Sequence, residues 1–187
     1  ALWEAFQHSA DIAFAPCKEH FQAQAQMREK NAEERRKLIS ELDSYHQNYN
    51  WEQANWKDVE HTLRVAKDAW KTLWPVPRSE QKELQAAFDA TLDKIYAPMN
   101  DAYERVKQKK EQLITLAEKA AELPDPKQAA EDIKALQNQW KQAGRTFRKA
   151  DQQLWQQFRA TCDKVFEKRQ AIFDEANAQK REKLQQG

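Results

Sequence analysis

One stretch of sequence decides the fold because it occurs three times: LWEAFQHSADIAFAPCKEHF (residues 2–21), LQAAFDATLDKIYAPMNDAY (residues 84–103) and LWQQFRATCDKVFEKRQAIF (residues 154–173). In each copy an aromatic residue is followed five positions later by Asp, and then by two further aromatic residues at intervals of three and seven. The third copy supplies Phe158, Asp163, Phe166 and Phe173. This recurrence predicts a tandem repeat with a period of about 70 residues.

A short amphipathic helix is predicted before the second and third copies. Trp70 and Trp140 each lie 18 residues before the first aromatic residue of their copy. Apolar residues surround each Trp at alternating intervals of three and four, which is typical of one apolar helix stripe. The two stripes are Trp56, Val59, Leu63, Ala66, Trp70 and Leu73, and Ala129, Ile133, Leu136, Trp140 and Ala143.

Capping residues predict where the short helices begin and end. Asn50 and Asp125 are suitable N-caps, and Pro126 suits the first helical position. The expected stops are residues 74–77, which read Trp-Pro-Val-Pro, and Gly144.

Each repeated stretch is expected to begin a long helix. From Ser79 to Glu122 the only proline is Pro98, and Pro16 takes the same place in the first copy. We expect both prolines to lie inside continuous helices. A heptad seam that supports coiled-coil-like packing is predicted for the second copy. It consists of Phe88, Leu92, Ile95, Met99, Ala102, Val106, Lys109, Leu113 and Leu116.

The expected fold is therefore all-α: an elongated tandem repeat of short helix–loop–long helix units with coiled-coil-like long helices. Residues 1–50 would form a partial first repeat that contains only the long helix. Residues 51–125 would form the second repeat, and residues 126–187 the third, with a truncated long helix.

The composition excludes several classes of function. The chain has 187 residues and only 2 Gly, too few for an all-β fold, a Gly-rich phosphate loop or a dinucleotide fingerprint. No window approaches 18 consecutive apolar residues, so no membrane span is expected. Cys17 and Cys162 make no disulfide framework, which indicates a reducing cytoplasm.

The second and third copies carry a set of short motifs. The third copy has Trp140-Lys141, Gly144, Phe147-Arg148, Leu154-Trp155, Phe158-Arg159 and Asp163-Lys164-Val165-Phe166. The second has Trp70-Lys71, Pro77-Arg78, Leu84, Phe88 and Asp93-Lys94-Ile95-Tyr96, with Trp74 in place of the Gly. With these motifs the chain resembles the bacterial family called domain of unknown function 349 over nearly its whole length. The resemblance implies an all-helical, tandem-repeat, bacterial cytoplasmic protein, and it implies no activity.

Two Asp-x-x-His pairs, Asp43 with His46 and Asp58 with His61, have a spacing that resembles that of metal ligands in helical bundles. Helical bundles hold two metal ions with Glu-x-x-His pairs and two further inward carboxylates, which this chain does not offer. Ordinary surface polar residues explain the pairs better. We expect no metal and no cofactor.

No nucleophile stands out either. Cys17 and Cys162 fall on apolar helix faces, where buried small hydrophobic residues are expected. We therefore expect no enzyme and no small-molecule substrate.

The recurring aromatic residues are interpreted as the core of the repeats. They are Trp70, Trp140, Trp155, Phe88, Phe158, Phe166 and Phe173. Base stacking is an open alternative for Trp51, Trp56 and Trp74.

Basic residues recur where a short helix gives way to a long one. The candidate binding residues are Lys71, Arg78, Lys141, Arg145, Arg148, Lys149 and Arg159. Lys71 and Lys141 also complement the dipole at a helix C-terminus. Three alternatives stay open for this set: a solvated cluster, a contact with an anion or nucleic acid, and a contact with an acidic protein surface.

The expected function is a non-enzymatic helical-repeat scaffold that presents these basic inter-helix loops to a macromolecular partner. RNA or ribosome binding through the basic third repeat is the alternative, since residues 127–187 hold 13 basic and 8 acidic side chains. A helical-bundle metal protein is a remote alternative. If the partner is anionic, Lys141, Arg145, Arg148 and Arg159 should converge on one exposed surface.

Overall fold

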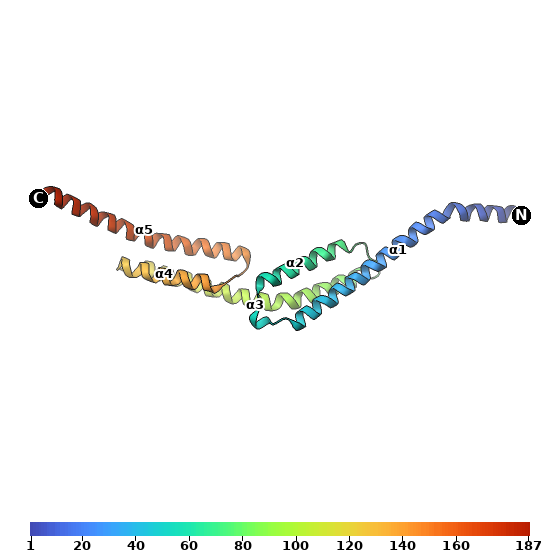
Figure 1. Cartoon of the computed structure of the whole chain (residues 1–187), viewed down its shortest axis with the longest axis horizontal. Coiled ribbons are helices and arrows are strands. Elements are labelled where there is room, and N and C mark those ends of the chain that lie inside the picture. The colour runs from blue at the N-terminus through green and yellow to red at the C-terminus, as the bar shows by residue number, and fades with distance from the viewer. The chain divides into compact units, whose positions relative to one another are not determined.

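The computed structural model describes residues 1–187, and every element in it is a helix. Three long helices alternate with two short ones, in the order drawn in Figure 1. They are α1 (Leu2–Asn48), α2 (Trp56–Thr72), α3 (Gln81–Ala121), α4 (Pro126–Ala143) and α5 (Arg148–Gln186). A single 3₁₀ turn, η1 (Trp51–Gln53), lies between α1 and α2. The expected all-α fold with alternating short and long helices is therefore confirmed.

The chain divides into two compact units, residues 1–98 and residues 99–187. The division falls inside α3, which runs through Pro98 without interruption. Pro16 likewise lies inside α1. The expectation that both prolines sit within continuous helices is confirmed. The repeat boundaries expected after residues 50 and 125 stay a prediction.

The start of α2 differs from the expected one. Asn55 is its N-cap, with a side-chain oxygen that accepts from the backbone N–H of Asp58 at 3.4 Å. Asn50 instead caps η1, where its side chain accepts from the backbone N–H of Glu52 at 3.2 Å. Two Asn residues five positions apart can each begin a helical turn, and the nearer one begins α2.

The boundaries of α4 follow the capping signals closely. The side chain of Asp125 accepts from the backbone N–H of Lys127 at 3.0 Å, and Pro126 is the first helical residue. Gly144 follows the last residue with a φ of 90°, a conformation that favours glycine. The expected start and stop of this helix are confirmed.

In the first unit, α2 packs its apolar stripe against the two long helices. Val59, Leu63, Ala66 and Trp70 are buried, as the pattern predicts. The Trp70 ring stacks on Phe88 of α3 with centroids 4.0 Å apart and planes 4° from parallel.

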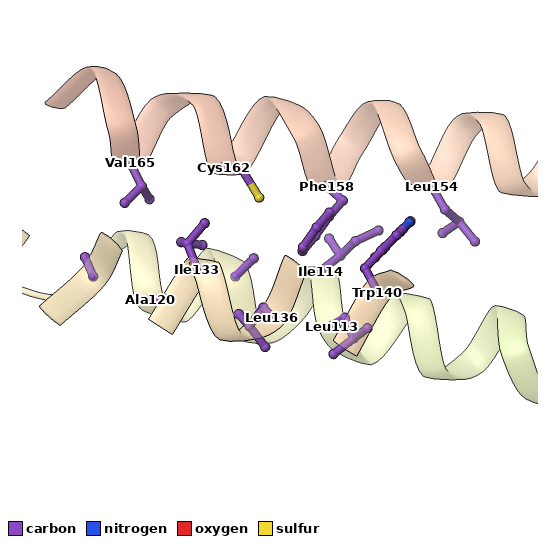
Figure 2. Close-up of a cluster of buried hydrophobic side chains, with 12 residues drawn as sticks. Leu113, Ile114, Ala120, Ile133, Leu136, Trp140, Leu154, Phe158, Cys162 and Val165 are labelled. Atoms are coloured by element: carbon purple, nitrogen blue, oxygen red, sulfur yellow. The ribbon is translucent and has the colours of Figure 1, made fainter. Parts of the chain in front are cut away.

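The second unit repeats this arrangement with α3, α4 and α5 (Figure 2). Trp140 of α4 stacks on Phe158 of α5 at 4.3 Å and 9°. The remaining buried members of the cluster are Leu113, Ile114, Ala117, Ala120, Ala129, Ile133, Leu136, Leu154, Cys162 and Val165. The prediction that Trp70 and Trp140 occupy equivalent buried positions is confirmed.

The heptad seam predicted for α3 is correct for its first half and for Leu113, but not for the rest of its second half. Phe88, Leu92, Ile95, Met99 and Leu113 are buried. Lys109 and Leu116 are exposed, whereas the buried positions further along are Tyr103, Lys110, Ile114, Ala117 and Ala120. An α-helix has 3.6 rather than 3.5 residues per turn, so a strict heptad stripe drifts around a helix that does not supercoil.

Several side chains expected in the core lie at the surface instead. Trp155 is 45% exposed and Phe173 is 61% exposed, while Phe158 is fully buried and Phe166 partly buried. Cys17 is exposed, so the expectation that both cysteines are buried is wrong for Cys17 and confirmed for Cys162. Phe173 and Cys17 lie on parts of the long helices that no other helix covers.

No helix combines the length and the apolar character that crossing a membrane requires.

Candidate functional site

All seven predicted basic residues have exposed side chains. Lys71 and Lys141 lie in the last turns of α2 and α4. Arg78 and Arg145 lie in the connections that follow these helices, and Arg148, Lys149 and Arg159 lie on α5. The structure thus places the set at the ends of the two short helices, on the connections that follow them and on the first half of α5.

The position of two of these cations is unfavourable for the helix that carries them. Arg148 and Lys149 are the first two residues of α5. The N-terminus of a helix carries partial positive charge, so cations there do not stabilise it. Lys71 and Lys141, at helix C-termini, do complement the dipole.

The predicted basic residues include one, Arg159, that forms an ion pair on its own helix. Arg159 lies 3.7 Å from Asp163 on the same helix, and both side chains are exposed. Such a pair contributes about 0–1 kcal/mol. Asp151, a nearby acid in α5, is instead paired with Lys110 at 2.5 Å.

The expected convergence of Lys141, Arg145, Arg148 and Arg159 stays a prediction. Arg148 and Arg159 share α5 and lie eleven residues apart, which is about three helical turns. Residues at that spacing lie on the same side of a helix.

Both basic connections are fastened to the preceding long helix. The carbonyl of Pro75 accepts from the Asn31 side-chain amide at 2.8 Å, and Val76 is buried. In the second unit the hydroxyl of Thr146 donates to the Tyr103 carbonyl at 2.7 Å, and Thr146 is buried. Val76 and Thr146 lie 70 residues apart, so they occupy the same place in the repeat. The exposed cations therefore project from connections with a fixed path.

Two further cations, which the sequence analysis missed, lie beneath the tryptophans. The Arg35 guanidinium of α1 lies 4.1 Å from the centre of the Trp70 ring and donates to the Trp70 carbonyl at 3.1 Å. The Lys110 ammonium of α3 lies 5.1 Å from the centre of the Trp140 ring. Arg35 and Lys110 are both 4% exposed, and burial lowers the pKa of Arg35.

A sequence signal for these buried cations exists. Arg35 lies three residues before Leu38-Ile39, and Lys110 lies three residues before Leu113-Ile114. The same order of residues in two long helices marks equivalent positions. These cations belong to the core and are not available to a partner.

The tryptophans considered for base stacking differ in exposure. Trp51 is partly buried and donates from its indole N–H to the His46 carbonyl at 3.0 Å. The rings of Trp51 and Trp56 lie 6.0 Å apart and belong to an aromatic cluster with Tyr45 and Tyr49. Only Trp74, which is 52% exposed, presents a large free area.

The two Asp-x-x-His pairs have other interactions. Asp43 accepts from the Thr91 hydroxyl at 3.2 Å and lies 3.6 Å from the Lys94 ammonium. His61 forms a hydrogen bond with Arg64 at 2.9 Å. No group of three or more His, Cys, Asp and Glu side chains comes together in a way that could hold a metal ion.

Comparison with known proteins identifies the family. No curated protein and no solved structure matches the chain. A family model described as Domain of Unknown Function (DUF349) matches twice, over residues 1–79 and residues 80–149. The first match contains α1 and α2, and the second contains α3 and α4, so each covers a long helix and the short helix that follows it. The two matches together span most of the sequence, and the chain belongs to the DUF349 family.

Proposed function

We propose that this chain is a non-enzymatic helical-repeat protein of the cytoplasm that binds an acidic macromolecular partner through its two basic connections. The observation that carries the proposal is that Lys71, Arg78, Lys141 and Arg148 are exposed on, or directly beside, two connections with a fixed path. A surface that is already ordered loses little conformational entropy when it binds.

The contrast between the two kinds of cation supports this proposal. Arg35 and Lys110 are buried against tryptophan rings and serve the fold. Arg148 and Lys149 are exposed at a helix N-terminus, where they oppose the helix dipole. Side chains that do not help their own helix are good candidates for an intermolecular role.

Binding of single-stranded RNA is a second candidate, favoured by Trp155. This residue is 45% exposed and lies four positions before Arg159 on α5. Residues four apart on a helix are surface neighbours. An exposed indole beside an exposed guanidinium can stack a base and contact its phosphate.

The test measures fluorescence anisotropy with two labelled probes: a poly-Glu peptide and an oligouridine, each of about 20 units. The test variant carries Arg145→Glu, Arg148→Glu and Arg159→Glu. The matched control carries Arg169→Glu, Lys180→Glu and Lys183→Glu, which change the same charge at exposed positions elsewhere on α5. We expect the wild type and the control to bind the peptide, and the test variant to bind it at least about tenfold more weakly, since each lost pair contributes up to about 1 kcal/mol.

The salt dependence separates the two candidates. Single-stranded RNA binding has a log–log salt slope of about −0.7 per phosphate contact, so loss of three contacts should reduce the slope by about 2. Tight, steeply salt-dependent binding of the oligouridine with weak binding of the peptide would favour RNA. If the test variant and the control bind equally well, and circular dichroism shows that the helicity is intact, the basic connections are not the binding surface.

A further inference from the structure

The second unit has an open hollow between the end of α3 and the middle of α4. Its volume is about 350 Å³, and its walls are mostly apolar. Ala120, Leu123 and Leu136 belong to these walls, and Figure 2 labels the first and the last of them. Lys119 and Asp132 are the two charged residues that line it. None of the seven basic candidates takes part in it, so it is a separate feature of the surface.

The position equivalent to Ala120 carries a tyrosine in the first unit. Lys110 follows Arg35, its equivalent, by 75 residues, so the equivalent of Ala120 in α1 is Tyr45. Tyr45 is partly buried, and its ring lies 5.1 Å from that of Tyr49. Alanine ends at its Cβ. The second unit therefore lacks the ring that the first unit supplies at this place.

The hydroxyl of Tyr45 shows where that ring points. It is hydrogen-bonded to Thr62 of α2. Equivalent residues of the two short helices lie 70 positions apart, so the equivalent of Thr62 in α4 is Asp132. The Tyr45 side chain thus reaches from the long helix to the short one across the place where the second unit, between Ala120 and Asp132, has its hollow.

The hollow is more apolar than the repeat itself requires. Leu116, one of its walls, is 46% exposed, whereas its equivalent Glu41 in the first unit is an exposed acid. Leu136 is larger than its equivalent Ala66, but it does not close the hollow. The unit that lacks its own ring therefore offers a half-exposed leucine that a ring from outside would cover.

The polar side of the hollow selects a hydrogen-bond donor. One oxygen of Asp132, Oδ1, accepts from the Gln128 amide at 2.8 Å, and a carboxylate has the capacity to accept further hydrogen bonds. A hydroxyl that donates to a carboxylate forms a charge-assisted bond. Lys119, on the same hollow, offsets the charge of Asp132. The arrangement suits an uncharged aromatic ring with a hydroxyl group.

The openness of the hollow indicates how such a ring is delivered. A site for a free small molecule encloses most of the molecule's surface, whereas this hollow is open to solvent on one side. A ring that enters from a polypeptide needs no such enclosure, because the rest of the chain stays outside. In the first unit, too, the ring belongs to a protein side chain.

We propose that the hollow between α3 and α4 binds a tyrosine side chain of a partner protein, whose ring takes the place of the Tyr45 ring and whose hydroxyl donates to Asp132. The proposal is independent of the basic connections. It differs from them in chemistry, since an apolar contact and one hydrogen bond replace charge pairing.

The test uses the full chain with two probes that differ only in the hydroxyl group, N-acetyl-tyrosine amide and N-acetyl-phenylalanine amide. Backbone amide shifts of Ala120 and Asp132 in NMR spectra report occupation of the hollow. We expect the tyrosine probe to bind with a dissociation constant of about 1 mM, as suits a single side chain. The phenylalanine probe should bind at least about threefold more weakly, because it has no donor for Asp132.

Three variants locate the site. Ala120→Tyr copies the first unit and should fill the hollow, so that the tyrosine probe binds at least about tenfold more weakly. Gln112→Tyr is its matched control, since Gln112 is an exposed α3 residue that does not line the hollow. Leu116→Glu copies Glu41 at a half-exposed position, leaves the core intact and should also weaken binding. Asp132→Ala should remove the preference for tyrosine over phenylalanine.

The absence of shifts at about 10 mM tyrosine probe would overturn the proposal. Equal binding by Ala120→Tyr and Gln112→Tyr chains of intact helicity would do the same, and so would equal binding by Leu116→Glu and the wild type if Ala120→Tyr does not fold. Equal affinity of the wild type for the two probes would refute the role of Asp132. Tighter binding of p-cresol, the same ring as a free molecule, would assign the hollow to a small phenol and refute a tyrosine borne by a protein.

One further variant separates this site from the proposed function. The chain with Arg145→Glu, Arg148→Glu and Arg159→Glu should bind the tyrosine probe like the wild type, because none of these residues lines the hollow. The tyrosine site and the basic connections can therefore fail independently.

Discussion

Replacement of Trp140 by Ala tests the contact at the centre of the second unit. Trp140 is 8% exposed, stacks on Phe158 at 4.3 Å and has the Lys110 ammonium 5.1 Å from its ring centre. Truncation of a buried Trp to Ala costs about 3–5 kcal/mol. The aromatic stack and the cation contact contribute about 0.5–1.5 kcal/mol each beyond area burial, which places Trp140→Ala in the upper part of this range. We expect a loss of about 4–5 kcal/mol.

Amide hydrogen exchange measures this loss locally. Protection of the core amides of α4 should fall roughly 10³-fold, since each 1.4 kcal/mol corresponds to about a factor of ten. The amides of α2, in the other unit, serve as an internal reference and should change little. The control is Trp155→Ala, which should cost about 1 kcal/mol because Trp155 is 45% exposed. A loss below about 1 kcal/mol for Trp140→Ala would refute the interpretation of this ring as the centre of the core.

Two further predictions concern Gly144 and the cysteines. Gly144 has a φ of 90° and a ψ of −154°, and no atom lies within 4 Å of a Cβ built there, so Gly144→Ala should cost about 1–3 kcal/mol through backbone strain alone. The measurement is urea unfolding followed by circular dichroism, and an unchanged midpoint would contradict it. Burial, with a smaller effect from the Asp163 carboxylate, raises the pKa of Cys162 to about 11, so at about pH 8 its thiol stays protonated as well as shielded. Ellman's reagent should therefore react rapidly with Cys17 alone in the native protein and with both thiols in denaturant; rapid reaction of both in the native protein would be inconsistent with this structure.

The parts of the fold that depend on local pattern could be predicted from the sequence. The buried faces of α2 and α4 follow from the intervals around Trp70 and Trp140, because an amphipathic helix shows its core face in its own sequence. The boundaries of α4 follow from Asp125 and Gly144, because caps are also local. The seven basic candidates were expected at the connections, and the structure places them there or at the beginning of α5 with exposed side chains.

The parts that depend on which helix covers which face could not be predicted. Leu116 is exposed and Ile114 is buried because the second half of α3 packs with α4 and α5, whose positions the sequence of α3 does not encode. Arg35 and Lys110 were overlooked because a charged side chain is buried only when other helices supply partners, here a tryptophan ring and a carbonyl or carboxylate. Cys17 has an apolar neighbourhood in sequence but no covering helix.

The stack of cation, tryptophan and phenylalanine determines how far the effect of a destabilising substitution spreads along the chain. Trp70 and Trp140 are each held between the later half of one long helix and the earlier half of the next. The helix α3 takes both roles, since it supplies Phe88 to the first stack and Lys110 to the second. Stability in such an array is a sum of local terms and nearest-neighbour couplings. A substitution at Trp70 therefore destabilises the stack around Trp140 only through local unfolding that spreads along α3. Units of this design can be added, deleted or weakened one at a time while their neighbours keep their own cores.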